Sequence, residues 1–159
     1  MGHVFRTRAS FSIGASLTMP PGALPDPQFV TDKLGIVPSS SHKAGERLSP
    51  RSTGFKHGQW SLTSPLPRDS QLESHLVWLL ERLSPVSPAV REILGTDERL
   101  RARFFCGLWL KDWNEMLGFA PKTLQAIADL NADLDLDIYW WGDDDSEPPG
   151  DAPAHSESP

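Results

Sequence analysis

The sequence has little of what usually identifies an activity. Its 159 residues include one cysteine, Cys106, and one tyrosine. A single cysteine excludes an intramolecular disulfide, so we expect a reducing, cytoplasmic setting. No apolar run approaches the roughly 18 residues of a membrane-spanning helix. Arg6 and Arg8 are followed by alternating serines rather than by the apolar segment of a signal peptide. We therefore expect no membrane association.

A basic surplus is also missing. The formal net charge is −6, and the segment 143–159 holds six acidic residues and four prolines without any lysine or arginine. This composition predicts a disordered acidic, proline-rich tail, because it cannot bury enough apolar surface to offset the entropy of ordering. Residues 1–142 are expected to form a single α+β domain with 15 acidic and 15 basic residues. A neutral domain does not favour nucleic acid as a partner.

The sequence gives no support to a metal site. Asp133, Asp135 and Asp137 have the spacing of a calcium loop, but Ile138 and Asp144 stand where that loop needs glycine and a bidentate glutamate. Leucines between the acids favour the polar face of a strand. We expect no metal and no cofactor.

Catalytic groups are equally scarce. His42, His57 and His75 lack the close spacing of a zinc motif, and Cys106 alternates onto an apolar strand face, where a thiol is a small inert hydrophobe. The sequence has neither a G-x-S-x-G elbow nor a phosphate-binding glycine loop. We therefore predict that the protein is not an enzyme.

Alternating apolar and polar residues predict four strands, at 5–17, 59–64, 101–111 and 134–141. In the last of these, the leucines, Ile138 and Trp140 are expected on the buried face.

Helices are expected between these strands. The first has Asp26 as its N-cap and Pro27 at its first helical position, and it ends at Gly35. Another starts at Ser87-Pro88 and ends at Gly95. Others are expected at 72–83, after a capping box at Ser70–Glu73, and after the proline at 121.

Arg-x-Arg opens two of the strands, and each is followed by a helix and a strand that carries tryptophan. This repetition predicts two βαβ units in a four-stranded, mainly antiparallel sheet with helices on one face. The plan is the ferredoxin-like split βαβ, with an extra helical connection between the halves. It places Arg6 and Arg8 across the sheet from Asp135 and Asp137.

Several short motifs occur in a fixed order along the chain. They are Phe11-x-Ile13, Leu34-Gly35-Ile36-x-Pro38, Lys43-x-Gly45-Glu46, Trp60-Ser61-Leu62, Leu76-x-Trp78-Leu79-Leu80 and Leu136-Asp137-Ile138-Tyr139. Together they resemble the bacterial domain-of-unknown-function family numbered 4279, over about Val4 to Trp141. That family has no established activity, so the resemblance implies domain boundaries and leaves function open.

One loop could hold a small anion. Residues 39–47 combine serines, histidine and two cations near a glycine, and such loops can cradle anions with backbone amides. The candidate ligand-binding residues are His42, Lys43, Gly45, Arg47 and Trp60. Any solvated loop can have the same composition.

Two surfaces could bind a protein partner. On the 72–83 helix, Trp78 lies off the leucine stripe and aligns with His75 and Arg82. Tryptophan beside arginine is common at interface hot spots, although such a residue also covers helix–helix seams.

The polar face of the sheet carries four aromatic residues, Phe105, Trp109, Tyr139 and Trp141. RNA-binding sheets also carry aromatic residues, but the aspartates beside these would repel phosphate. A protein partner or self-association is the better interpretation.

These patterns favour a non-catalytic protein-interaction domain, of which an immunity-like protein is one example. The alternative is a small-ligand or anion-binding domain that uses the Ser39–Arg47 loop.

Overall fold

The computed structural model describes residues 4–112 and 115–140. Trp141 and the tail predicted at 143–159 lie outside this range. The elements follow one another as β1 (Val4–Ala15), α1 (Gln28–Leu34), β2 (Ser40–His42), β3 (Gln59–Thr63), α2 (Leu72–Leu83), the 3-10 turn η1 (Ser84–Val86), α3 (Ser87–Leu94), β4 (Leu100–Leu110), α4 (Pro121–Asp129) and β5 (Ala132–Trp140).

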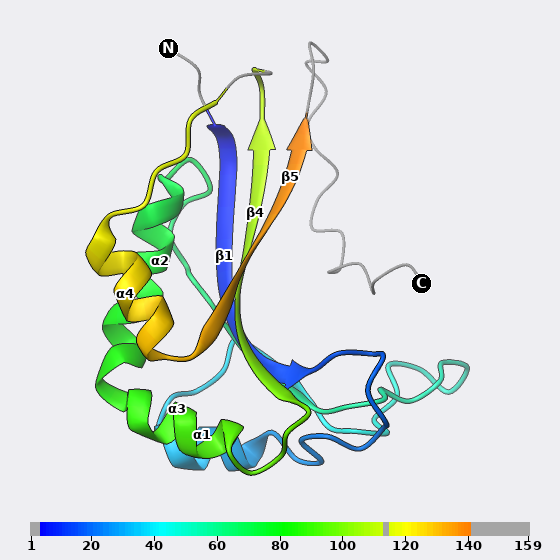
Figure 1. The fold of residues 1–159 in the computed structure, drawn as a ribbon. Helices are drawn as coiled ribbons and strands as arrows, with labels where there is room; N and C mark the ends of the chain where they lie inside the picture. Colours follow the sequence, from blue (N-terminus) through cyan, green and yellow to red (C-terminus); the bar gives the residue numbers. More distant parts are fainter. Residues whose placement is uncertain (1–3, 113–114, 141–159) are drawn as a thin grey trace.

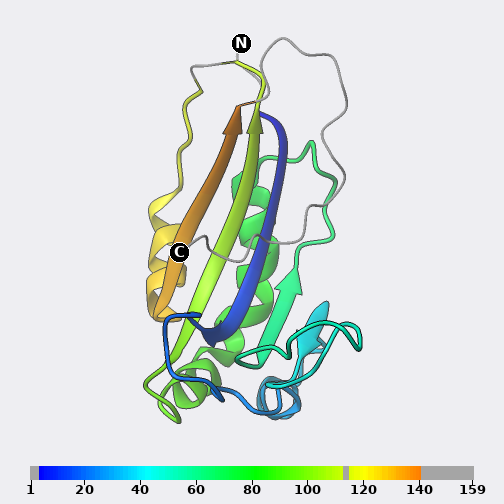
Figure 2. The same ribbon diagram turned by 90° about the vertical axis from the view of Figure 1, so that its right-hand side faces the viewer.

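The strands form one sheet in the order β2-β3-β1-β4-β5. The pairs β2–β3, β3–β1 and β1–β4 are antiparallel, and β4 pairs with β5 in parallel. Figure 2 shows this sheet from its open side. The mixed α+β class is confirmed, and the two Arg-x-Arg strands, β1 and β4, lie in the interior of the sheet.

The sheet nevertheless has five strands rather than the four predicted, because the irregular 38–58 stretch contributes the short edge strand β2. The ferredoxin-like plan is not confirmed. Its order would put β5 beside β1, whereas β5 pairs with β4. A β-α-β connection through the short helix α4 returns the chain next to the strand it left, as is common for parallel neighbours.

The predicted contact of Arg6 and Arg8 with Asp135 and Asp137 across neighbouring strands is therefore wrong, because β4 lies between β1 and β5. In its place, Arg103 of β4 lies 3.4 Å from Asp135. Both side chains are about half exposed, so this ion pair contributes little to stability.

The helices lie on one side of the sheet, and the core fills the space between the two layers (Figure 1). The predicted leucine stripe of α2 is confirmed, since all five leucines are buried against the sheet. Phe11 and Phe104 meet in the centre of this core, with ring centroids 5.1 Å apart.

Local signals located most of the helix ends, although α1 begins at Gln28, one residue after the predicted Pro27. Gly35 ends α1 in the left-handed conformation at φ 66°, and Gly95 ends α3, both as predicted. The capping box at Ser70 is wrong, because α2 begins after Gln71 without a side-chain cap. Glu73 instead accepts hydrogen bonds from the Ala120 amide and the Thr123 hydroxyl at the start of α4, both at 2.7 Å. None of the helices in the described ranges has the length and hydropathy needed to cross a bilayer.

Candidate functional site

A cleft of about 390 Å³ opens on the sheet face opposite the helices. Its floor is formed by small residues of β1, Ser12 and Gly14. One wall comes from β4 and β5, and the other comes from the 43–58 segment, which joins β2 to β3 and is here called the arm. The lining residues are Ser12, Gly14, Ala15, Ser16, Leu17, His42, Phe55, Lys56, His57, Gly58, Gln59, Arg101, Arg103, Asp133 and Asp135.

The arm is held against β2 by stacked rings. The imidazole of His42 lies parallel to the Phe55 ring, with centroids 3.6 Å apart and planes 18° apart. Burial lowers the pKa of His42, and the nearby Glu46 carboxylate opposes that change. The stack gives the cleft a flat wall that is apolar at Phe55 and polar at His42.

A second contact joins the arm to the loop between β1 and α1. The Gly58 amide donates to the Ala23 carbonyl at 2.9 Å, and the Gly22 amide donates to the Lys56 carbonyl at 2.9 Å. The Ala23 amide donates to Nδ1 of His57 at 3.1 Å. A Cβ at Gly58 would lie 1.8 Å from the Leu24 carbonyl oxygen, so only glycine permits this approach.

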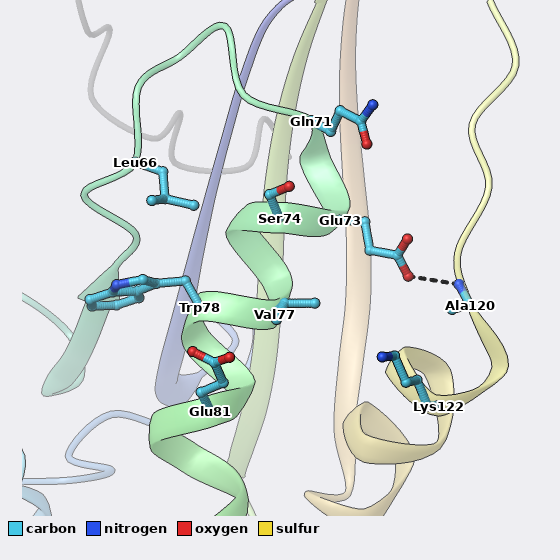
Figure 3. A pocket seen from close by; sticks show the side chains of 9 residues that line it. All are labelled: Leu66, Gln71, Glu73, Ser74, Val77, Trp78, Glu81, Ala120 and Lys122. Carbon is cyan, nitrogen blue, oxygen red and sulfur yellow. Dashed lines mark hydrogen bonds between the residues drawn. The ribbon is translucent and has the colours of Figure 1, made fainter.

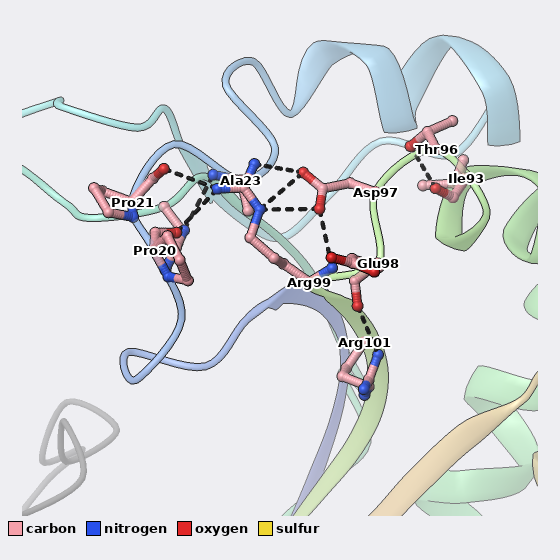
Figure 4. Close-up of polar contacts among 10 residues, drawn as sticks. Pro20, Pro21, Ala23, Ile93, Thr96, Asp97, Glu98, Arg99 and Arg101 are labelled. Carbon is pink, nitrogen blue, oxygen red and sulfur yellow. Dashed lines mark hydrogen bonds and ion pairs between the residues drawn. The ribbon is translucent and has the colours of Figure 1, made fainter.

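The same loop is anchored from its other side by Arg99 (Figure 4). Its guanidinium donates to the carbonyls of Pro20 and Pro21 at 3.0 and 2.8 Å. The Asp97 carboxylate accepts hydrogen bonds from Nε and Nη2 of the same guanidinium. These bonds from Arg99 hold the pKa of Asp97 at about 2. The loop between β1 and α1, which holds the arm in place, is thus fixed to the turn that precedes β4.

The strand wall carries four charged side chains. Arg103 pairs with Asp135 at 3.4 Å. Arg101 donates through Nη1 to the carbonyls of Glu98 and Leu100 at 3.1 and 3.0 Å. Within the described ranges, no carboxylate pairs with Arg101 and no cation pairs with Asp133. The strand wall therefore presents one cation and one anion that are not paired with each other, and on the arm Lys56 donates to the Leu17 carbonyl.

The residues predicted for an anion-binding loop are not arranged as an anion cradle. The amides of the loop bond within the protein: Lys43 to the Glu46 carboxylate, Ala44 to Pro25, Gly45 to Phe55 and Glu46 to Lys43. The Lys43 ammonium lies 3.4 Å from Asp26. Gly45 has φ 81°, which serves the turn.

The remaining residues of that prediction are dispersed. Arg47 is exposed on the arm. Trp60 is fully buried, and its indole donates to the Thr31 hydroxyl at 3.1 Å, so it belongs to the core. Only His42 reaches the cleft.

Three of the predicted sheet-face aromatics do come together. Trp109 and Tyr139 stack with centroids 5.3 Å apart, and the guanidinium groups of Arg8 and Arg68 lie 5.5 and 5.6 Å from the Trp109 ring. Phe105 lies beside Arg8 at 6.0 Å.

A glycine allows this arrangement. A Cβ at Gly107 would meet the Trp109 ring at 3.0 Å, so the indole lies flat on the sheet where a side chain is missing. Tyr139 donates its hydroxyl to Asp137, and this bond raises the pKa of Tyr139. The aromatic rings are covered by arginines and do not form an open apolar patch.

The other face of β5 holds a row of residues whose exposure the sequence did not predict. Leu136, Ile138 and Trp140 alternate toward the helix side, but they are 40, 52 and 69% exposed. Their predicted burial is wrong because α4 lies beside only the lower part of β5, and the upper part extends past it (Figure 2). Alternation identified the face, but the length of the covering helix decides how much of the face is buried.

A shallow groove of about 410 Å³ lies between α2 and the start of α4 (Figure 3). Trp78 lines it, and the Arg82 guanidinium lies 3.5 Å from the Trp78 ring centroid while donating to the Trp78 carbonyl at 2.8 Å. Trp78 and Arg82 therefore lie side by side on α2, as the sequence predicted. His75, predicted on the same flank, is buried and bonds Ser64 through Nδ1 at 2.9 Å.

Neither metal ligands nor a reactive thiol gather in the described part of the chain. It contains no group of three or more histidine, cysteine, aspartate or glutamate side chains that could hold a metal ion. Cys106 is fully buried, and burial raises the pKa of its thiol to about 12.

The comparisons with known proteins bear on the whole of this fold. A family model described as Domain of unknown function (DUF4279) matches residues 8–141, which include β2 to β5, the four α-helices and all of β1 except its first four residues. No curated protein and no solved structure matches the chain. The resemblance seen in the ordered motifs is thereby confirmed, and the chain belongs to the DUF4279 family.

Proposed function

We propose that this protein is a non-catalytic interaction domain of the cytoplasm, which binds an extended segment of a partner protein along the outer edge of β5. The carrying observation is the exposed row Leu136, Ile138 and Trp140 on a strand that, among residues 4–112 and 115–140, pairs on one side only.

A long, open edge strand is unusual in a protein that does not bind another strand. β5 is nine residues long, and its outer backbone groups face away from β4. Proteins commonly protect such edges with bulges, prolines or covering elements, because an open edge can pair with another strand. The opposite edge, β2, is only three residues long. Strand addition is a common mode of peptide recognition, in which main-chain bonds provide affinity and alternate side chains provide specificity.

Charge favours a foreign segment over a second copy. The face of β5 opposite the apolar row carries Asp133, Asp135 and Asp137. Antiparallel pairing of two β5 strands about position 135, 136 or 137 would place carboxylates of the two copies opposite one another, which is destabilising. A segment that alternates basic with apolar residues would match both faces. An immunity-like neutralising protein is one use of such a surface.

The absence of catalysis is part of the proposal and has a chemical basis. The one cysteine has a raised pKa and no access to solvent, so its thiolate is not available as a nucleophile. Within the cleft, Arg103 and Asp135 neutralise each other, and His42 has a lowered pKa because of burial.

The test uses a synthetic peptide that alternates lysine with valine, labelled for fluorescence anisotropy. We expect it to bind, and Ile138→Lys to weaken binding by about tenfold or more, since a charge would then be buried against the apolar side of the peptide. Leu48→Lys is the matched control, because Leu48 is 83% exposed on the arm that joins β2 to β3, at the other end of the strand order.

Further controls separate strand pairing from charge attraction. A peptide with N-methyl groups on alternate amides keeps its charge and cannot complete the ladder, so it should bind weakly. Equal binding of the two peptides, or equal effects of the two lysine variants, would refute strand addition. Light scattering of the purified protein should show a monomer, and a dimer that Ile138→Lys dissociates would favour a second copy as the occupant.

A further inference from the structure

We infer that the cleft on the open sheet face binds a small zwitterion, a molecule with a carboxylate and a protonated amine such as a free α-amino acid, through Arg101 and Asp133. This site lies on the opposite face of β5 from the apolar row and is independent of strand addition.

The first argument is charge. Arg103 and Asp135 satisfy each other at 3.4 Å, which leaves Arg101 and Asp133 as the strand wall's cation and anion without a counter-charge in the described ranges. The other cation of the cleft, Lys56, donates to the Leu17 carbonyl. Arg101 is prevented from turning toward Asp133 because its Nη1 donates to the carbonyls of Glu98 and Leu100. A guanidinium held in this way is preorganised to receive a carboxylate.

The second argument is separation. In the β4–β5 register Arg103 lies beside Asp133, so Arg101 is a diagonal neighbour of Asp133, two residues along the adjacent strand. Strand spacing and rise put their Cα atoms roughly 8 Å apart. Two side chains at that separation can hold the two charged ends of one small molecule between them. A simple anion would satisfy Arg101 and leave Asp133 repelling it.

A buried polar group lies in the lining of the cleft. His57 lines the cleft and is only 5% exposed. Its Nδ1 accepts the Ala23 amide, so the hydrogen of the neutral ring is on Nε2, which is buried and has no hydrogen-bond partner in the described part of the chain. An unsatisfied buried donor is costly, and a ligand oxygen in the cleft would remove that cost.

Size and shape agree with a small ligand. The volume of about 390 Å³ is at the low end of the range for small-molecule sites. Ser12 and Gly14 keep the floor low, and the His42–Phe55 stack provides a flat wall for a side chain of the ligand. The cleft therefore has separate places for a carboxylate, an amine and an apolar group.

The experiment titrates each of the common L-amino acids into ¹⁵N-labelled protein and follows the backbone amides that line the cleft. The best binder is then compared with its N-acetyl and its carboxamide derivatives, which each lack one charge. We expect saturable shifts confined to the cleft, and affinity about tenfold or more weaker for each capped form, as for loss of a charge-assisted hydrogen bond.

Matched variants test the two residues. Arg101→Gln and Asp133→Asn should each weaken binding by about tenfold, whereas Arg91→Gln and Asp69→Asn, exposed elsewhere, should not. The inference is overturned if no amino acid shifts the cleft amides, if a capped form binds as tightly as the free one, or if both cleft variants retain full affinity. Ile138→Lys should leave amino-acid affinity unchanged, so failure here and failure of strand addition are distinguishable.

Discussion

Replacing Gly58 with alanine should open the cleft wall. The added methyl group would lie 1.8 Å from the carbonyl oxygen of Leu24 and 3.3 Å from that of His42. Since comfortable non-bonded separations are about 3.5 Å, the arm and the β1–α1 loop would have to move apart by about 1.7 Å. Both neighbours are backbone atoms, so a side-chain rotation cannot relieve the contact.

That movement breaks a specific set of hydrogen bonds. They join Gly58 to Ala23, Gly22 to Lys56 and Ala23 to His57, at 2.9, 2.9 and 3.1 Å. Each contributes about 1 kcal/mol net, and a donor left buried without a partner costs more. We expect Gly58→Ala to lower the free energy of unfolding by about 2–4 kcal/mol.

The assay is urea denaturation followed by tryptophan fluorescence, with Gly118→Ala as the control. A Cβ at Gly118 would meet nothing within 4 Å, so that variant should be neutral or more stable by about 0.5 kcal/mol. If Gly58→Ala unfolds at the same urea midpoint as Gly118→Ala, with an unchanged m-value, the close approach does not hold the wall together and the reasoning is refuted.

Three further outcomes follow from individual contacts. The Asp97 pKa is lowered from 3.8 to about 2, so the stability from its bonds with Arg99 is fully present above pH 4 and is lost as pH falls through 2. Asp97→Asn should therefore be less stable than wild type at pH 7, and urea midpoints should converge by pH 2; a constant difference would contradict this. Glu73→Ala removes the acceptor of the Ala120 amide and should lower the thermal midpoint, with Glu73→Gln in between; unchanged midpoints for both would show that α4 does not need this cap. Cys106, with its pKa near 12, should not react with a thiol reagent in native protein at pH 8, and should react in urea; rapid native labelling would disprove its burial.

Elements with a strong periodic pattern could be predicted from the sequence. The five leucines of α2 lie on one stripe, and all are buried. The strand predicted at 101–111 is found at Leu100–Leu110, with Cys106 on its apolar face. These predictions succeed because repeat length and burial are local consequences of one face meeting the core.

Strand order and the candidate sites depend on distant contacts that no local pattern records. The alternation in β5 is the same whether it pairs with β1 or with β4. The burial of Leu136 and Ile138 depends on how far α4 extends along β5. The cleft forms because the arm folds back onto the 20–24 loop. In the sequence, the residue that permits this close approach is Gly58, and nothing distinguishes it from the other glycines of the chain. Trp60 was correctly placed on a strand face, but that face packs into the core, so the indole cannot reach a ligand at the Ser39–Arg47 loop even though Ser41 is its strand partner.

The position of β1 between β3 and β4 has a consequence for synthesis. Of the five strands, the ribosome makes this central one first, yet its last neighbour is finished only when Leu110 has been added. During that interval Phe11 and Ile13, which are fully buried in the finished sheet, have no complete partner surface. The nascent chain thus passes through a period of exposed apolar strand in which chaperone binding or misassociation competes with folding, and slowing translation between residues 64 and 110 should prolong it.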